Sequence, residues 1–333
     1  MMAQRSPSGQ LDSIRKPVME QCEELEGYFK SYLKTDVLLI DRIFEHLIDG
    51  GGKRFRPLLV LLVSSCSPHQ INEDVFKLAV AVEFIHTATL LHDDVVDQSD
   101  VRRGNRVAYR IWGAEPSVLS GDYLYSRAFN LLVEIGHLGI LDALSGATTQ
   151  MARGEVLQLL RSYSTATTRE EYLEVINGKT ASLISASCIA AGYLAELKGR
   201  NLEAAGEYGL NLGLSFQIVD DVLDYSSQRG VLGKAIGKDF LEGKVTLPVI
   251  ILMENVSQKH KRQVADIFLK DTPDSDDFQL VLNLMKEHSV LEKTLEVAMD
   301  FRDRALKELM DIPDNPCRGS LHALADYVVE RSS

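Results

Sequence analysis

An apolar run that ends in a cluster of aspartates constrains this chain more than any other feature. From Val75 to Leu91 the run is broken only by two charged residues, one histidine and two threonines, and it leads into Asp93, Asp94 and Asp97. Apolar residues on nearly every face are typical of a helix buried in a large protein. Asp93 and Asp97 share one helix face, where like charges repel and an unpaired buried carboxylate costs on the order of several kcal/mol. The pattern therefore predicts a counter-charge, and a hard cation such as Mg²⁺ suits clustered carboxylate oxygens.

The same arrangement returns once, after a second apolar run from Phe216 to Val219. This run is followed by Asp220, Asp221 and Asp224. A single Asp-Asp-x-x-Asp motif is a weak indication, because a solvated helix end often carries three aspartates, but two copies on apolar helices are hard to obtain by chance. Mg²⁺ shares its coordination shell with substrate phosphates, so two facing carboxylate surfaces would hold a cluster of ions together with a phosphorylated substrate.

The composition narrows the class of protein. The chain has 333 residues, which suffices for one large domain or two ordinary ones. Long helical patterns recur and strand signals are few, which favours an all-α fold. We expect a flexible leader over residues 1–16 and a single domain over residues 17–333. The net charge of −12 argues against a nucleic-acid surface, and it requires local cations or metal ions wherever a phosphorylated substrate binds.

Two further observations bear on location. The cysteines show no metal-ligand spacing, which is typical of free buried thiols in a reducing compartment; they are Cys22, Cys66, Cys188 and Cys317. The polar N-terminus lacks the apolar core of a signal peptide, and no stretch has about 18 uninterrupted apolar residues, so no transmembrane helix is predicted. We therefore expect a cytoplasmic protein.

Helical periodicity and breaker residues outline the elements. Gly206, Gly209 and Gly213 share a face of one predicted helix and would let another backbone approach closely. A segment rich in glycine and lysine, from Ser226 to Gly243, indicates a basic loop. Besides the central helix, helices are predicted at 17–33, 37–47, 58–65, 116–134, 138–161, 170–197 and 203–225.

Several short motifs accompany the aspartates. They are Gly51-Gly52-Lys53-Arg54-Phe55-Arg56-Pro57, His86, Arg102-Arg103-Gly104, Gly178-Lys179-Thr180, and the segment from Gly233-Lys234 to Gly243-Lys244. With these motifs in this order, the chain resembles the trans-isoprenyl (polyprenyl) diphosphate synthases from about Val37 to its C-terminus. Residues 84–97 are similar to those of bacterial octaprenyl and decaprenyl diphosphate synthases. The resemblance implies an isoprenoid-synthase fold, a large helical bundle around a central cavity, and a Mg²⁺-dependent prenyltransferase, in a family that is usually homodimeric.

The resemblance also implies roles for individual residues. The aspartates would bind Mg²⁺, led by Asp93, Asp97 and Asp220, with Asp94, Asp221 and Asp224 in a lesser part. The diphosphate of isopentenyl diphosphate would be held by Lys53, Arg56, His86 and Arg103. The allylic diphosphate would be held by Arg102, Lys179, Lys234 and Lys244. Oxygen atoms of Thr180 and Gln217 would face the developing allylic cation.

Simpler structural roles compete with several of these. His86 alone is more often a core histidine with satisfied hydrogen bonds, the adjacent arginines 102–103 would complement a helix dipole, and the lysines of the basic loop, including Lys238, would be solvated. The implied mechanism is ionisation of the allylic diphosphate, attack by isopentenyl diphosphate and loss of a proton. No sequence feature identifies a protein base for the last step.

The residues just before the first motif bear on product length. In the family that the chain resembles, the product grows down a tunnel that leads away from the metal site; Ala88 and Thr89 would line its mouth, with Ile85 one helical turn deeper. Short-chain members of the family tend to have bulky aromatics there, whereas Ala88 and Thr89 are small, so we expect a long product of roughly C40–C50 for a quinone side chain. The starter would be farnesyl or geranylgeranyl diphosphate. The alternative is that Ala88 and Thr89 are close-packing residues.

Four rival functions remain to be weighed. A shorter-chain synthase would share every motif. A non-catalytic subunit of a heteromeric synthase commonly loses an aspartate motif, whereas both are intact here. A terpene cyclase usually replaces the second motif and needs no second diphosphate site, and a calcium-binding module would need an Asp-x-Asp-x-Asp-Gly loop. The sequence leaves open the exact chain length, the starter, the quinone class and the oligomeric state.

Overall fold

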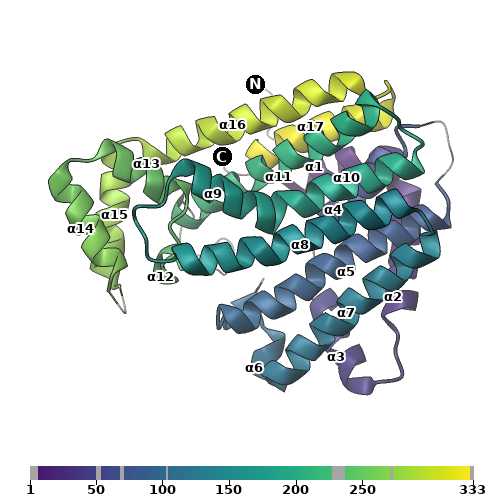
Figure 1. Ribbon diagram of the computed structural model, residues 1–333, viewed down its shortest axis with the longest axis horizontal. Helices are drawn as coiled ribbons and strands as arrows, with labels where there is room; N and C mark the ends of the chain where they lie inside the picture. Colours follow the sequence, from purple (N-terminus) through teal and green to yellow (C-terminus); the bar gives the residue numbers. More distant parts are fainter. Residues whose placement is uncertain are drawn as a thin grey trace. The chain divides into compact units, whose positions relative to one another are not determined.

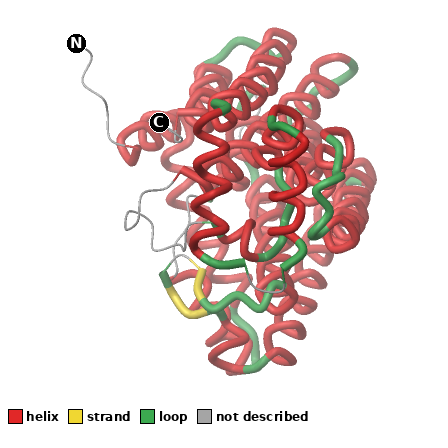
Figure 2. The backbone as a smooth tube through the Cα atoms, turned by 90° about the vertical axis from the view of Figure 1, so that its left-hand side faces the viewer, coloured by secondary structure: helices red, strands yellow, loops and turns green. Residues whose placement is uncertain are grey.

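The computed structural model describes residues 7–49, 54–67, 71–102, 104–226, 237–270 and 273–330. These residues are mostly helical, and one antiparallel hairpin is formed by β1 (Val101–Arg102) and β2 (Asn105–Arg106) (Figure 2). The all-α prediction is therefore confirmed. Contacts between Cα atoms divide the chain into two compact units, the first comprising the described residues of Met1–Thr148, Leu183–Gly209 and Glu308–Leu324, and the second those of Thr149–Ser182, Leu210–Lys307 and Ala325–Ser333.

The first unit is built around the long apolar helix α5. Its elements are α1 (Pro7–Arg15), η1 (Lys16–Val18), α2 (Met19–Leu33), α3 (Leu38–Asp49), α4 (Phe55–Ser64), α5 (Glu73–Val96), the hairpin, α6 (Ala108–Trp112), α7 (Ala114–Ile135), the start of α8 (Leu138–Arg161), α10 (Ser182–Leu194), the start of α11 (Arg200–Ser226), η3 (Leu309–Asp311) and most of α17 (Pro316–Glu330). The side chain of Asn72 caps α5 by accepting from the Val75 N–H. Helix α5 then packs along α7 and against α4 (Figure 1).

Helix α5 carries the apolar run that opened the sequence argument. By length and composition alone it could cross a membrane, but 61% of its most apolar window is buried inside the protein. It is therefore a core helix. Elsewhere in the first unit, α10 and α11 touch at Gly209, where a Cβ would lie 2.8 Å from the Ile184 carbonyl oxygen. This confirms the close backbone approach predicted for that glycine.

The second unit has a separate apolar core. Its elements are the end of α8, α9 (Arg169–Ile176), the π-helical turn η2 (Asn177–Ala181), the end of α11, α12 (Lys238–Leu241), α13 (Leu247–Asn255), α14 (Gln258–Phe268), α15 (Ser275–Glu287) and α16 (Val290–Glu308). Ile218, Val219 and Ile250 lie in its buried cluster, as does Phe240, which packs edge-on against Phe268 at 5.3 Å. This core fixes the end of α11 that carries the second aspartate motif.

Three details differ from the sequence-based expectation. The segment expected to be a flexible leader contains helix α1, whose Leu11 and Ile14 are buried. The helix predicted over 170–197 is interrupted by the π turn, because this stretch meets α8 at a tight crossing. Part of the predicted basic loop forms the short helix α12. The prediction of a single domain stays a prediction.

Candidate active site

The three aspartates of the first motif have different surroundings. Asp93 and Asp97 are half-buried at the last turn of α5. Asp94 is only 3% exposed, and its Oδ1 accepts a hydrogen bond from Nε of Arg102 at 2.9 Å. Because Arg102 lies in β1, this ion pair ties the hairpin to α5. Arg102 thus lies in a strand, and not in the last turn of a helix before Gly104 as the helix-dipole interpretation assumed.

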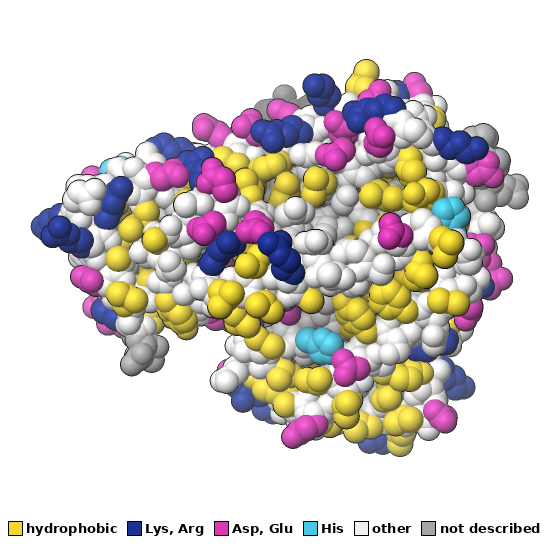
Figure 3. Space-filling view, viewed as in Figure 1, with side chains coloured by type: hydrophobic (Ala, Val, Ile, Leu, Met, Phe, Trp, Pro, Cys, Tyr) yellow, Lys and Arg dark blue, Asp and Glu magenta, His cyan; other side chains and the backbone are white. Residues whose placement is uncertain are grey.

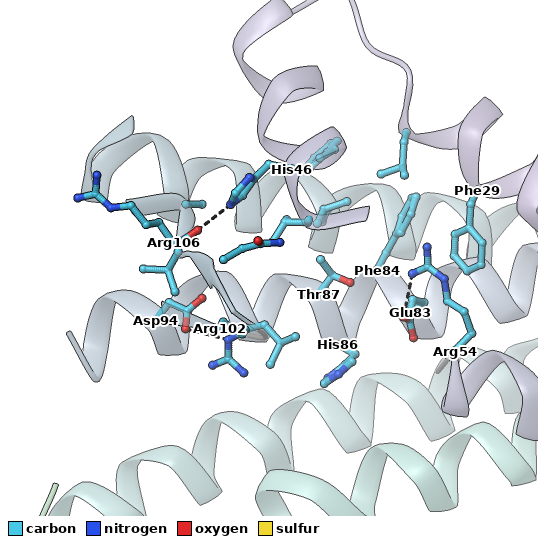
Figure 4. A pocket seen from close by; sticks show the side chains of 18 residues that line it. Phe29, His46, Arg54, Glu83, Phe84, His86, Thr87, Asp94, Arg102 and Arg106 are labelled. Atoms are coloured by element: carbon cyan, nitrogen blue, oxygen red, sulfur yellow. Dashed lines mark hydrogen bonds and ion pairs between the residues drawn. The ribbon is translucent and has the colours of Figure 1, made fainter. Parts of the chain in front are cut away.

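A cavity of about 840 Å³, including its mouth, opens beside α5 within the first unit (Figure 4). Its walls are partly aromatic, from Phe29, Phe44 and Phe84, and partly charged. Two residues predicted to bind diphosphates, His86 and Arg102, contribute to its lining. The cavity therefore offers both an apolar wall and cationic groups, which is the combination that a prenyl diphosphate requires.

Ion pairs fix the opposite end of this cavity. Arg54 adopts a left-handed backbone conformation (φ 46°) at the start of α4. Its Nη1 donates to Oε1 of Glu83 at 3.1 Å, and its guanidinium lies 4.6 Å from the centre of the Phe29 ring. Arg56, in the first turn of α4, is half-buried. Three predicted ligands, Lys53, Arg103 and Lys234, lie outside the described residues.

The residues predicted to set chain length lie within α5. Ile85 and Ala88 are fully buried, and Thr89 is half-buried, with its Oγ1 donating to the His86 carbonyl at 2.8 Å. None of them lines the cavity of Figure 4, to which α5 contributes Phe84, among others. Their role in product length stays a prediction.

In the second motif, as in the first, one aspartate is buried and hydrogen-bonded while another is half-buried. Asp220 is half-buried on α11, whereas Asp221 is 2% exposed and accepts two hydrogen bonds. These come from Oη of Tyr172 to Oδ2 at 2.5 Å and from Nε2 of Gln217 to Oδ1 at 2.9 Å. Burial raises the pKa of Asp221 well above its usual range, and nearby Asp239 raises it further, while the two hydrogen bonds act in the opposite direction.

The third aspartate of this motif, Asp224, accepts hydrogen bonds from backbone N–H groups. The carboxylate of Asp224 accepts from the N–H of Lys238 at 3.2 Å and from the N–H of Asp239 at 3.0 Å. The Asp224 carbonyl accepts from the Gly237 N–H. Asp224 thereby fixes the start of α12 against the end of α11.

The π turn places two further predicted residues beside this motif. Helix α9 begins with a capping box between Thr168 and Glu171, and it runs into the turn at Asn177. Lys179 then donates from Nζ to Oε2 of Glu155 at 2.8 Å and to Oε1 of Gln158 at 3.0 Å. π-helical insertions are frequent at functional sites, because they shift the side chains that follow them.

A second cavity, of about 640 Å³ with its mouth, joins these residues within the second unit. Lys179, Gln217, Asp221 and Lys244 all line it. Thr180 is linked to the cavity through Gln217, because Oγ1 of Thr180 donates to Oε1 of Gln217 at 2.8 Å. The structure thus brings together five of the predicted residues of the second unit.

Sequence reasoning missed several residues of this cavity. Tyr172, Arg161 and Asp239 also line it, and Glu155 holds Lys179. Asp239 is half-buried; burial raises the pKa of its carboxyl, and Lys244 opposes this. The one available signal was a phenol in an otherwise apolar position, since a buried Tyr usually needs a hydrogen-bond partner.

The oxygen donors fit a hard divalent cation. Within the described ranges, no three His, Cys, Asp or Glu side chains converge into a closed metal cage. Mg²⁺ is usually bound by one or two carboxylates and completes its octahedron with water and substrate phosphate, so open pairs such as Asp93 and Asp97 suit it. Asp94, next to Asp93 in the chain, and Asp221, next to Asp220, already accept hydrogen bonds from protein side chains.

Fold and site together define an α-helical prenyltransferase. The polyprenyl synthetase family model matches residues 37–285, and the chain belongs to this family. It is 36% identical over 321 residues to octaprenyl diphosphate synthase of Escherichia coli (strain K12), covering 96% of this chain and 99% of that protein. The protein is accordingly a polyprenyl diphosphate synthase.

Two solved structures share the whole fold. A decaprenyl diphosphate synthase from Rhodobacter capsulatus has a TM-score of 0.92 and 38% identity, with 97% of this chain and 99% of that chain covered. A polyprenyl synthase from Caulobacter crescentus CB15, complexed with calcium and isoprenyl diphosphate, has a TM-score of 0.91 and 39% identity, with 97% and 98% covered.

Proposed function

We propose that the protein is a long-chain trans-polyprenyl diphosphate synthase. It condenses isopentenyl diphosphate onto farnesyl or geranylgeranyl diphosphate and gives an octaprenyl to decaprenyl product for a quinone side chain. The observation that carries the proposal is that Lys179, Gln217 and Asp221 line one cavity. Thr180 is joined to them by a hydrogen bond to Gln217. Similarity to long-chain synthases over the whole chain supports the product class.

The chemistry begins with ionisation of the allylic diphosphate. The allylic C–O bond breaks, its electron pair leaves with pyrophosphate, and the double bond of isopentenyl diphosphate forms the new C–C bond with the cation. A proton is then lost to give the trans double bond. Mg²⁺, held by Asp93, Asp97 and Asp220, would supply charge neutralisation on the departing pyrophosphate.

The protein's own cations bind the two diphosphates. Arg102, Lys179 and Lys244 would hold the allylic group, which must leave, and Arg56 with His86 would hold the isopentenyl group, which must stay. Guanidinium groups are suited to this because they form paired hydrogen bonds with phosphate oxygens. The oxygens of Thr180 and Gln217 would place negative dipole ends toward the allylic cation.

Product analysis tests the proposal. The purified protein is incubated with farnesyl diphosphate, labelled isopentenyl diphosphate and Mg²⁺, and the products are resolved by chain length, with a parallel reaction in EDTA. A dominant linear product of C40–C50, the range of the related synthases, is the expected result. A product that stops at geranylgeranyl diphosphate would favour the shorter-chain alternative, and no incorporation with either starter would favour a non-catalytic subunit.

A homodimer in the cytoplasm belongs to the same proposal. Figure 3 shows a face on which hydrophobic side chains gather among charged ones. In the first unit, Leu119 and Val133 of α7 are each 65% exposed and Leu138 is 83% exposed. A contiguous apolar patch on a surface is typical of an interface, whereas single exposed apolar side chains are common. Light scattering after size exclusion measures the mass, and a monomer at all concentrations would contradict a dimer.

A further inference from the structure

A chain of hydrogen bonds links Tyr172 to Thr180 through two other side chains. Oη of Tyr172 donates to Oδ2 of Asp221 at 2.5 Å. Nε2 of Gln217 donates to Oδ1 of the same carboxylate at 2.9 Å, and Oε1 of Gln217 accepts from Oγ1 of Thr180 at 2.8 Å. The four residues come from α9, α11 and the π turn, so the chain connects three elements of the second unit.

The order of donors along this chain follows from chemistry. The two hydrogen bonds of Gln217 fix its orientation, because Oδ1 of Asp221 accepts from its NH₂ group and the Thr180 hydroxyl donates to its carbonyl oxygen. The Thr180 hydroxyl donates its hydrogen bond to that carbonyl oxygen, so the lone pairs of Thr180 Oγ1 remain available. Both side chains therefore present electron-rich oxygen, which is what a neighbouring cation requires.

Burial restricts this hydrogen-bonded series of side chains to one arrangement. Tyr172 is 4% exposed, Asp221 2% and Thr180 7%. Without Tyr172 Oη, Asp221 would lose the hydrogen bond that sets its side-chain rotation, and Gln217 would lose a fixed partner. In a buried network, the loss of one member frees the others to rearrange.

We infer that Tyr172 is a positioning residue for the allylic ionisation: through Asp221 it orients the carbonyl oxygen of Gln217 and the hydroxyl oxygen of Thr180. This inference rests on the proposed function. Tyr172 acts through its hydrogen bond to Asp221, so its effect falls on the rate of the chemical step rather than on substrate binding.

The test compares two buried tyrosines that lose the same atom. Tyr172→Phe removes the donor to Asp221, whereas the matched control Tyr208→Phe removes a donor to the Leu321 carbonyl, at 2.7 Å, in the first unit. The rate of the first condensation is measured in a single turnover, so that slow product release does not mask it. Michaelis constants for both substrates and melting temperatures are measured in parallel.

We expect Tyr172→Phe to lower the single-turnover rate roughly tenfold to a hundredfold, the scale of a small misplacement of catalytic groups. The Michaelis constants of Tyr172→Phe should stay within about twofold of the wild-type values. Tyr208→Phe should keep the wild-type rate. The melting temperature should fall by a similar amount in both variants, because each loses one buried hydrogen bond. A rate for Tyr172→Phe equal to that of Tyr208→Phe would overturn the inference. An inactive wild-type protein would instead contradict the proposed function.

A double-mutant cycle separates positioning from general damage. In an Asp221→Asn background, the additional change Tyr172→Phe should have little effect, because the path through the carboxylate is already broken. Additive losses would show that Tyr172 acts independently of Asp221 and would also overturn the inference. Gln217→Glu tests the same hydrogen-bond path with Tyr172 unchanged, because it replaces the NH₂ group that donates to Asp221 by a carboxylate oxygen. An unchanged rate in Gln217→Glu would contradict the inference even if Tyr172→Phe failed to fold.

Discussion

Gly154 on helix α8 and Gly178 in the π turn lie in direct backbone contact. A Cβ on Gly154 would lie 2.7 Å from the backbone nitrogen of Lys179 and 3.1 Å from Cα of Gly178. Real Cβ atoms do not approach backbone this closely, so only glycine fits. The contact brings Lys179 to α8, where its Nζ reaches Glu155.

Replacing Gly154 by alanine should therefore displace the π turn. We expect Gly154→Ala to lower the free energy of unfolding by about 1–3 kcal/mol, the usual cost of overpacking. It should also weaken binding of the allylic diphosphate, because Lys179 moves. Urea unfolding and the Michaelis constant for farnesyl diphosphate measure the two effects.

Gly146→Ala on the same helix is the matched control. A Cβ at Gly146 would have no neighbour within 4 Å. Alanine should then stabilise the helix by roughly 0.5–1 kcal/mol through its better helix propensity. Equal effects of the two substitutions would contradict a special contact at Gly154.

The long periodic elements could be predicted from sequence because their signal is local. The helix predicted over 138–161 has those bounds in the structure, and Gly209 makes the predicted close approach. The π turn could not be predicted, because it depends on the crossing of Gly154 with Gly178, and the two lie far apart in sequence. Local propensity continues the helix through this point, and tertiary contact overrides it.

In the candidate site, too, some residues could be predicted from the sequence and others could not. Spacing pointed to Asp221, and the resemblance to the polyprenyl diphosphate synthases pointed to Lys179 and Gln217; the structure places all three around one cavity. Tyr172 was missed because its partner, Asp221, lies 49 positions away and a Tyr within a helical pattern looks like core. The backbone partners of Asp224 were missed because they belong to a segment expected to be loop.

Loss of the Asp224 carboxylate should loosen α12. Asp224→Ala removes the acceptor for the N–H groups of Lys238 and Asp239. At about 1 kcal/mol or more per hydrogen bond to a charged group, amide exchange at these two positions should accelerate at least about fivefold. Hydrogen–deuterium exchange measures this.

Asp300→Ala, an exposed aspartate on α16, is the control for loss of charge. It should leave exchange over α12 unchanged. Exchange at Lys238 and Asp239 that does not respond to Asp224→Ala would mean that other contacts hold this helix.

The buried thiols predict an alkaline loss of stability. Burial raises the pKa of Cys66 and Cys188 from 9.0 to about 12. Between these values the unfolded chain has released the thiol protons while the folded protein keeps them, so the free energy of unfolding falls as pH rises, by up to about 1.4 kcal/mol per pH unit for each thiol. Below about pH 8 the effect is absent.

Cys188→Ala should remove one thiol's share of this slope. Urea unfolding of wild type and variant at several pH values from about 8 to about 11 gives the slopes, and their difference cancels the titration of lysines and tyrosines. Cys22→Ala is the control, because Cys22 is only half-buried and should change the slope less. Parallel curves for wild type and Cys188→Ala would contradict the raised pKa.

The last prediction concerns product length. Ala88 is fully buried on α5, five residues before Asp93. If the growing chain passes it, the series Ala88→Val, Ala88→Leu and Ala88→Tyr should shorten the product step by step as the side chain grows. Overpacking would lower stability by about 1–3 kcal/mol in either case, so product length, resolved by chromatography, is the deciding measurement. Ala79→Tyr controls for overpacking, because Ala79 is equally buried but lies nine residues earlier, on the opposite face of the helix. It should destabilise the protein and leave the product long, whereas an unchanged product in Ala88→Tyr would remove Ala88 from the path of the chain.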